Sequence, residues 1–242
     1  MRISTLQNLS AIPTSFRWVV RHRGLVAGLA ALWAILMTLA PWVQMKVGIP
    51  HQELTSAILV RVFTLPIEFY LLPMLLAYVD SEFHRNPANP REGWQRTFES
   101  RGAMAALAQL LLFVAVMLGT VAFIIPGVVI MILLGWMPMY LLLRGGSITH
   151  AARWSLSIMV KEWRRVILAV LPVFGIYVVL IFGLVFAITR GVPEHTLWLR
   201  FRHPYFWLFN LLTSAVNIWV SLALLAIFHK VENEAMLKSE DV

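Results

Sequence analysis

The fold class is decided by residues 102–143, GAMAALAQLLLFVAVMLGTVAFIIPGVVIMILLGWMPMYLLL. No charged side chain interrupts this stretch. A transmembrane helix needs ~20 consecutive apolar residues to cross a hydrocarbon core ~30 Å thick, and this stretch is long enough for two such helices. Pro126-Gly127 near its middle is typical of a tight turn. We therefore predict two spans, residues 102–124 and 127–143, that form a close antiparallel hairpin.

Four more apolar stretches, residues 24–43, 54–79, 166–188 and 205–228, complete a set of six predicted transmembrane helices. The chain is 60% hydrophobic and only 13% charged, whereas an ordinary soluble domain is about 25% charged. The apolar runs are also continuous and about twice as long as the ~10-residue alternating strands of a membrane β-barrel. No polar segment is long enough to bury a core of its own, so we expect one all-α, polytopic membrane domain over residues 1–242.

Between the fourth and fifth spans, residues 147–163 form a predicted amphipathic helix. Gly145-Gly146 should end the preceding helix, and Ser147 is placed to cap this one. One face is apolar and the other is polar, and a basic helix of this kind lies in the headgroup plane of a membrane. The apolar face carries Ile148, Ala152, Leu156, Met159 and Trp163, and the polar face carries Arg153, Ser157, Lys161 and Arg164.

Positive charge is distributed unevenly over the connections between the spans. The N-terminus, the 80–101 and 144–165 connections and the C-terminal tail carry 15 of the 20 Lys and Arg residues, and the opposite connections carry four. Cytoplasmic loops carry such an excess, so we predict that both termini lie in the cytoplasm. The net charge of +8 then indicates topology and contact with anionic lipid rather than nucleic acid. The lipid-headgroup contacts that we expect are Arg153, Lys161, Arg164 and Arg165.

The sequence contains no recognisable motif for metal, cofactor or covalent chemistry. It has no cysteine, which excludes thiolate nucleophiles and cysteine-based metal sites. The seven histidines lack helical metal spacing, and neither a phosphate-binding glycine loop nor a Gly-x-Ser-x-Gly turn occurs. Asp80, Glu82 and His84 are the best remaining grouping for phosphate chemistry, although a solvated loop is the simpler explanation. We therefore expect no catalytic residue, no metal and no cofactor.

Glu68, near the middle of the second span, is the main candidate for a functional side chain. An ionisable group there costs ~2.5–3.5 kcal/mol on insertion scales, and such groups usually face the bundle interior or water. Arg61 lies two turns earlier on the same face, and Pro66 and Pro73 flank Glu68 and should kink the helix. Two interpretations stay open. Glu68 forms a site for an ion, a proton or a substrate, with or without Arg61, or it belongs to a structural network while Arg61 extends to the interface.

The sixth span carries a polar stripe, in which Asn210, Ser214 and Asn217 are spaced four and three residues apart. Such side chains usually form hydrogen bonds to neighbouring helices, each contributing ~0.6 kcal/mol. Lining of a pathway is the alternative, and the stripe would then face Glu68 across the bundle.

A series of motifs begins with Ile124-Ile125-Pro126-Gly127-Val128-Val129, which is followed by an apolar span that contains Pro138. The amphipathic helix with Arg153 and Ser155 comes next, and the series ends with Trp163-Arg164-Arg165. On these motifs, the segment from residue 123 to about 180 resembles the YciC-like family of bacterial inner-membrane proteins. It is also similar to the related membrane domain fused to some glycerophosphodiester phosphodiesterases. The resemblance implies a six-helix inner-membrane protein, supplies no catalytic residue, and leaves Arg61 and Glu68 without a family counterpart.

These features favour a non-enzymatic accessory or scaffold subunit in envelope or lipid-related processes. Its expected partners are membrane lipids, especially anionic ones, and another membrane protein or a second copy of the chain. The alternative is a small transporter or permease subunit in which Glu68 is the coupling or binding carboxylate. A membrane-embedded lipid enzyme that uses residues 80–84 is a third and more distant hypothesis.

Overall fold

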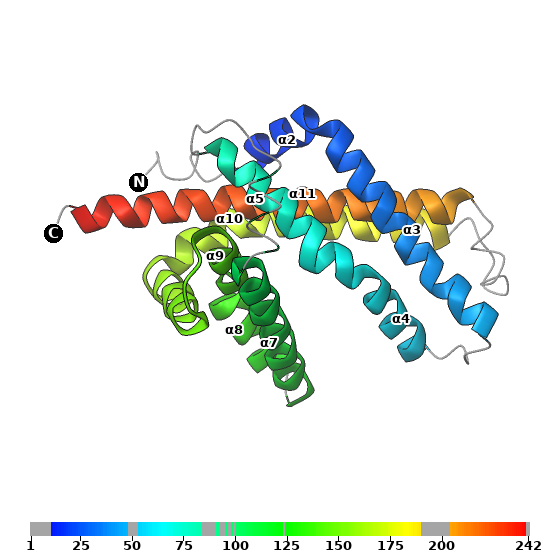
Figure 1. Ribbon diagram of the computed structural model, residues 1–242, viewed down its shortest axis with the longest axis horizontal. Helices are drawn as coiled ribbons and strands as arrows, with labels where there is room; N and C mark the ends of the chain where they lie inside the picture. Colours follow the sequence, from blue (N-terminus) through cyan, green and yellow to red (C-terminus); the bar gives the residue numbers. More distant parts are fainter. Residues whose placement is uncertain are drawn as a thin grey trace. The chain divides into compact units, whose positions relative to one another are not determined.

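The computed structural model describes residues 11–47, 53–83, 91, 95, 98, 100–122, 124–189 and 204–240, which are almost entirely helical and include no strand (Figure 1). The predicted all-α class is therefore confirmed for the described part of the chain. Six segments in that part are long and apolar enough to cross a membrane: Arg23–Gln44, Val62–Asp80, Ser100–Gly119, Pro126–Arg144, Ile148–Gly183 and Trp207–Glu232. The architecture is that of a multi-pass membrane protein.

The chain divides into two compact units, one of Met1–Glu68 with Leu171–Ala223 and the other of Phe69–Val170 with Leu224–Val242. The two long C-terminal helices, α10 and α11, each contribute to both units because the division falls inside them. The elements are α2 (Ala11–Arg21), α3 (Arg23–Val47), α4 (Glu53–Pro66), the π-helical η1 (Ile67–Leu71), α5 (Leu72–Phe83), α7 (Ser100–Ala122), α8 (Ile124–Leu134), α9 (Met137–Arg144), α10 (Ile148–Thr189) and α11 (Pro204–Glu240).

In the first unit, α2 and α3 follow one another with hardly a break, since the His22 N–H still donates to the Trp18 carbonyl at 2.8 Å. α3 packs against α4. The Phe16 ring lies 5.3 Å from the ring of Trp219 in α11. Aromatic contact therefore holds the N-terminal helix of this unit against α11.

The second span contains a π-helical turn, η1, between α4 and α5. Pro66 ends α4, and Pro73 is the second residue of α5. A proline removes one backbone N–H and clashes with the carbonyl four residues earlier, and bends in helices concentrate at prolines and π turns. The irregularity that the two prolines predict therefore takes the form of a widened turn, and Glu68 lies in it.

In the second unit, α7 packs against α8 as a hairpin, but the turn differs from the prediction. α8 begins at Ile124, so Pro126 and Gly127 lie in its first turn and not in a loop. Proline is tolerated there because the first N–H groups of a helix have no partner within it. Gly119 of α7 and Gly127 of α8 instead allow the two helices to pack closely. A Cβ added to Gly119 would lie only 2.9 Å from the Gly127 Cα.

The fourth span is also interrupted, whereas the sequence predicted one helix over residues 127–143. α8 and α9 are separated by a turn that contains Gly135, and Pro138 lies in the first turn of α9. A Cβ on Gly135 would lie 2.5 Å from a backbone oxygen, so only glycine fits. The Ser155 Oγ of α10 donates to the Leu133 carbonyl at 2.7 Å and satisfies a carbonyl beside the break.

After α9, one helix ends and the next begins where Gly145 and Gly146 predict. Gly145 and Gly146 have positive φ angles of 76° and 96°, which glycine adopts without steric cost. The Ser147 Oγ accepts the His150 N–H at 3.2 Å, as a capping residue does. The predicted helix 147–163 and the fifth span then follow one another without a loop as two helical segments of α10, which are joined across a kink at Glu162.

Candidate functional site

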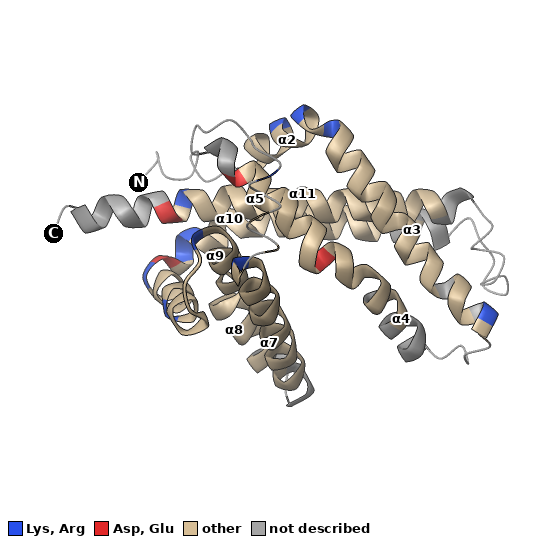
Figure 2. Cartoon of the chain, in the orientation of Figure 1, with Lys and Arg blue, Asp and Glu red and all other residues tan. Residues whose placement is uncertain are grey.

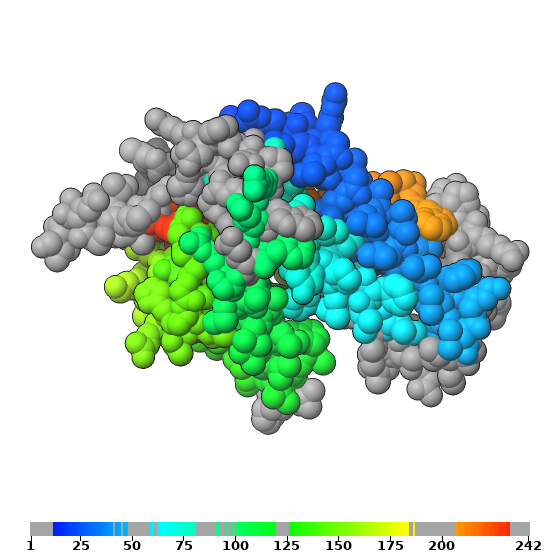
Figure 3. All heavy atoms as spheres, in the orientation of Figure 1, coloured from blue at the N-terminus to red at the C-terminus, as the bar shows by residue number. Residues whose placement is uncertain are grey.

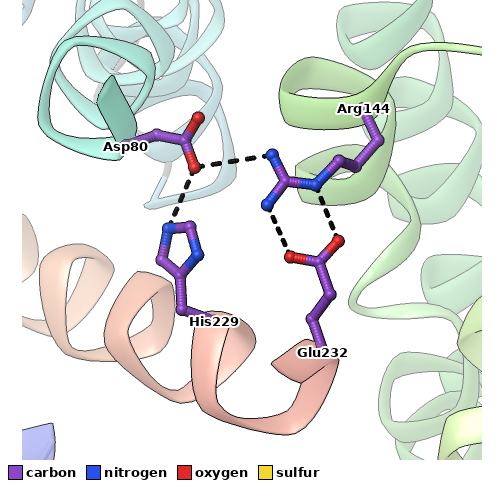
Figure 4. Close-up of polar contacts among 4 residues, drawn as sticks. All are labelled: Asp80, Arg144, His229 and Glu232. Carbon is purple, nitrogen blue, oxygen red and sulfur yellow. Dashed lines mark hydrogen bonds and ion pairs between the residues drawn. The ribbon is translucent and has the colours of Figure 1, made fainter. Parts of the chain in front are cut away.

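Four ionisable side chains meet in the second unit, and we call them the charge cluster: Asp80 of α5, Arg144 of α9, and His229 and Glu232 of α11 (Figure 4). Asp80, Arg144 and Glu232 are the last residues of three of the six membrane-spanning segments. The C-terminal ends of the second, fourth and sixth spans therefore lie together. Alternate spans of a bundle cross the membrane in the same direction, so this arrangement is the one that six consecutive crossings require.

The closest contact in the charge cluster is a two-point pair between Arg144 and Glu232. The Arg144 Nε donates to one carboxylate oxygen at 2.6 Å, and Nη2 donates to the other at 2.5 Å. Two parallel charge-assisted hydrogen bonds fix the orientation of both side chains and supply more attraction than one. Glu232 is buried and Arg144 is one-quarter exposed. Arg144 is also the last residue of α9, where a positive charge interacts favourably with the helix dipole.

Asp80 joins the charge cluster from α5 and is fully buried. Its Oδ1 lies 2.9 Å from the His229 Nε2 and 3.7 Å from the Arg144 Nη1. The cluster joins three helices and can therefore act as a clamp between them.

A group of aromatic rings lies beside the charge cluster. The Arg144 guanidinium carbon lies 5.9 Å from the ring centre of the buried Phe228. The Trp136 and Trp154 rings lie 6.2 Å and 5.3 Å from Phe228, and Tyr140 lies 4.7 Å from Trp154. Apolar rings lower the local dielectric, which strengthens satisfied charge pairs and raises the cost of an unpaired charge. The charged groups of the cluster consequently depend on one another.

The structure places Asp80 inside a helix, whereas the sequence favoured a solvated loop. α5 continues beyond Asp80, and the carboxylate contacts His229 and Arg144. The side chain of Glu82 and all of His84 lie outside the described residues. Within the described residues, no group of three His, Asp or Glu side chains is arranged to hold a metal ion. Asp80, the first member of the Asp80, Glu82 and His84 grouping considered for phosphate chemistry, is thus engaged by His229 and Arg144.

Sequence reasoning missed Arg144, His229 and Glu232 as members of a site. Each ends or follows an apolar run, where charged residues are ordinarily attributed to the membrane interface. One signal is nevertheless present in the sequence: His229 and Glu232 are three residues apart, so a helix presents both to the same neighbour.

Glu68 is half-buried on the π turn and accepts a hydrogen bond from the Thr64 Oγ1 at 3.1 Å. Thr64 lies one turn earlier on α4 and is itself buried. The Arg61 side chain lies outside the described residues, so its pairing with Glu68 stays a prediction. A local hydrogen-bond partner agrees with the structural interpretation of Glu68. The π turn agrees with the functional one, since such turns are frequent at functional sites.

The polar stripe of α11 contacts α3 in the first unit. The Asn210 Nδ2 donates to the Thr38 Oγ1 at 3.1 Å, and both side chains are buried. The Ser214 Oγ lies 3.8 Å from the Met37 Sδ, while the backbone carbonyl of Asn217 accepts a hydrogen bond within α11. Asn210 and Ser214 thus make contacts of the kind that hold membrane helices together.

The first part of α10 buries one face against the protein and exposes another. Its buried residues are Ala151, Ser155, Ile158 and Met159. Two members of the predicted apolar face, Leu156 and Trp163, are exposed, which agrees with a helix whose apolar face contacts lipid. Ser155 is buried and faces α8, where its Oγ donates to the Leu133 carbonyl.

The exposed face of this part of α10 combines apolar and basic side chains. Lys and Arg colour several segments of it blue in Figure 2, and its lime-green atoms lie at the surface in Figure 3. All four predicted lipid-headgroup contacts are exposed. The apolar members are Leu156, Val160 and Trp163, and the basic members are Arg153, Lys161, Arg164 and Arg165.

The sequence matches no protein-family model, and no curated protein or solved structure matches it either.

Proposed function

We propose that this chain is a non-enzymatic, multi-pass protein of the bacterial inner membrane that acts as an accessory or scaffold subunit in envelope or lipid-related processes. The observation that carries the proposal is the exposed face of α10 before its kink. There Leu156 and Val160 lie beside Arg153 and Lys161 on a surface that no described helix covers. A helix with an apolar row next to a basic row binds the boundary between lipid headgroups and acyl chains.

The length of α10 supports the same position for its first part. The apolar segment Ile148–Gly183 has 36 residues, about 54 Å at 1.5 Å per residue. A hydrocarbon core is only ~30 Å thick. The helix kinks at Glu162, the basic residues end shortly after the kink at Arg165, and an apolar part follows. We place the basic part on the cytoplasmic surface, together with both termini, because the charge bias of the connections favours that orientation.

The polar groups inside the spans support a scaffold rather than an open pathway. Asn210 bonds to Thr38 on a neighbouring helix, and Glu232 is held by Arg144 at two points. Side chains committed to other helices stabilise a fixed arrangement. A fixed arrangement suits a protein whose work is to hold lipids or other membrane proteins in place.

The proposed membrane-surface helix is tested by labelling single cysteines, because the chain has no cysteine of its own. Leu156→Cys and Val160→Cys should be protected from a membrane-impermeant maleimide in lipid nanodiscs. Ser157→Cys is the matched control, since it lies between them in sequence on the polar side and should react. Equal reactivity at the three positions would contradict a helix lying on the membrane.

The accessory role is tested by purification of the full chain in native nanodiscs, followed by mass spectrometry of the proteins that accompany it. A stoichiometric membrane-protein partner is the expected result. A chain that carries no protein partner but a defined small molecule would contradict the proposal and favour transport.

The second candidate function is a small transporter or permease subunit with Glu68 as its coupling carboxylate. The π turn at Glu68, between Pro66 and Pro73, favours it. Glu68→Gln separates the two functions. A neutral amide can still accept the hydrogen bond from Thr64, so it should leave a scaffold unchanged in stability and partner binding. The same substitution should abolish proton-coupled transport in reconstituted vesicles.

A further inference from the structure

A shallow hollow of about 420 Å³ lies at the kink of α10, and consecutive residues of one segment line it. Glu162 has φ −122° and ψ 19°, outside the helical range, so the segment bends there instead of continuing as a smooth cylinder. The hollow lies within the second unit on the exposed side of α10. Its lining is Val160, Lys161, Glu162, Trp163, Arg164 and Arg165.

The charge of the hollow is positive because its one carboxylate is engaged. The Arg165 Nη1 lies 3.1 Å from the Glu162 Oε2, so these two charges offset each other. Lys161 and Arg164 form no ion pair with a carboxylate among the described side chains. Two exposed cations thus remain at one bend of the helix, where they can contact the same anion.

Apolar surface borders the same hollow. The Val160 side chain is 70% exposed and Trp163 is 49% exposed. The Arg164 guanidinium carbon lies 5.3 Å from the Trp163 ring centre, within the range of a cation–π contact. Tryptophan beside arginine is the combination found at the headgroup level of membranes. The ligand that fits such a surface has an anionic head and an apolar chain.

We propose that the kink of α10 is a binding site for the phosphate group of an anionic phospholipid. Lys161 and Arg164 contact the phosphate, and Val160 and Trp163 contact the first part of the acyl chains. Arg165 offsets the charge of the Glu162 carboxylate, which also lines the hollow. Arg153 lies outside the site and contributes only to the general attraction of the helix to the membrane. The inference rests on the proposed membrane-surface position of this helix and adds a defined lipid site to it.

The experiment is native mass spectrometry of the full chain in detergent, titrated with phosphatidylglycerol and, separately, with phosphatidylcholine. The wild-type protein should bind phosphatidylglycerol more tightly. A direct ion pair between an exposed cation and the bound phosphate contributes up to about fivefold in affinity, so Arg164→Gln should weaken binding about fivefold. Lys161→Gln/Arg164→Gln should weaken it about thirtyfold by the same reasoning. Arg164→Lys should retain most of the affinity.

Arg153→Gln is the matched control, because it removes one exposed cation from the same helix but from outside the hollow. It should leave the affinity for phosphatidylglycerol nearly unchanged. If Arg153→Gln and Arg164→Gln weaken binding equally, the defined site is refuted while the membrane-surface helix stands. If the wild-type protein does not distinguish the two lipids, the site is refuted together with the lipid-binding part of the proposed function.

Inorganic phosphate distinguishes a lipid from a soluble anion. At concentrations equal to those of the lipid, it should not displace bound phosphatidylglycerol, because it lacks the chains that contact Val160 and Trp163. Displacement by inorganic phosphate at equal concentration would overturn the assignment to a lipid.

Discussion

Replacement of Arg144 by glutamine should destabilise the second unit more than any exposed substitution. The change removes both hydrogen bonds to Glu232 and the ion pair, at 3.7 Å, with the buried Asp80. Removal of one partner from a buried ion pair costs about 3–5 kcal/mol, since the other charge stays buried without compensation. Arg144 is one-quarter exposed, and water can partly solvate the vacancy, so we expect about 2–4 kcal/mol.

The assay is thermal unfolding of the purified protein in detergent, followed by tryptophan fluorescence and circular dichroism. For a chain of this length, each kcal/mol shifts Tm by roughly 2–4 °C, so Arg144→Gln should lower Tm by about 5–15 °C. The double variant Arg144→Met/Glu232→Met should be closer to the wild type than Arg144→Gln. Apolar residues of similar volume remove both charges of the two-point pair and often replace an ion pair at little cost, while Asp80 keeps its contact with His229.

The control is Arg153→Gln, which makes the same chemical change at an exposed position of α10. It should change the free energy of unfolding by no more than about 0.5 kcal/mol. A cycle of Arg144→Gln, Glu232→Gln and the double variant should give a coupling energy of about 1–3 kcal/mol. A coupling energy near zero, or equal Tm values for Arg144→Gln and Arg153→Gln, would refute the reasoning that the charge cluster clamps three helices.

Two further predictions concern the second unit. Gly119→Ala should lower the free energy of unfolding by about 1–3 kcal/mol, because the new Cβ would lie 2.9 Å from backbone atoms of α8. Thermal unfolding measures the loss, and Gly175→Ala, whose Cβ would meet nothing within 4 Å, should show none. Ser155→Ala should cost about 1–3 kcal/mol, since it removes the donor to the Leu133 carbonyl. Ser157→Ala, which breaks only a bond within its own exposed turn, should be nearly neutral in the same assay, and equal effects of the two serine variants would contradict the role of Ser155.

Apolar length and charge were sufficient to predict the helical class and six apolar spans, because membrane-spanning segments must satisfy every backbone hydrogen bond internally. Local rules also predicted the stop at Gly145-Gly146 and the cap at Ser147, since these depend only on neighbouring residues. The break between α8 and α9 was missed although Gly135 and Pro138 are visible in the sequence. Hydropathy averages over such a break, and a serine from another helix is needed to satisfy the backbone there.

The buried face of α10 could not be predicted from polarity for a related reason. Leu156 and Trp163 are exposed although both side chains are apolar. In a membrane, an exposed leucine or tryptophan contacts lipid at no hydrophobic cost, so polarity no longer indicates which side is buried. Ser155 is buried because its hydroxyl has a specific acceptor, and no periodicity argument can supply that acceptor.

The charge cluster also explains why its charges lie at the ends of spans. An unpaired ion at the membrane centre is expensive, while at a span end the same ion can be solvated during insertion and paired once the helices meet. The two-point geometry then determines the register of the C-terminal part of α11. A slide by one turn would move Glu232 by about 5.4 Å and bring the apolar ring of Phe228 toward Arg144 instead of a carboxylate. Apolar packing between membrane helices tolerates small slides, but a two-point ion pair does not. The pair therefore fixes the position of the C-terminal part of α11 relative to α9, as the proposed scaffold role requires. Arg144→Gln should allow this part of α11 to shift along its axis.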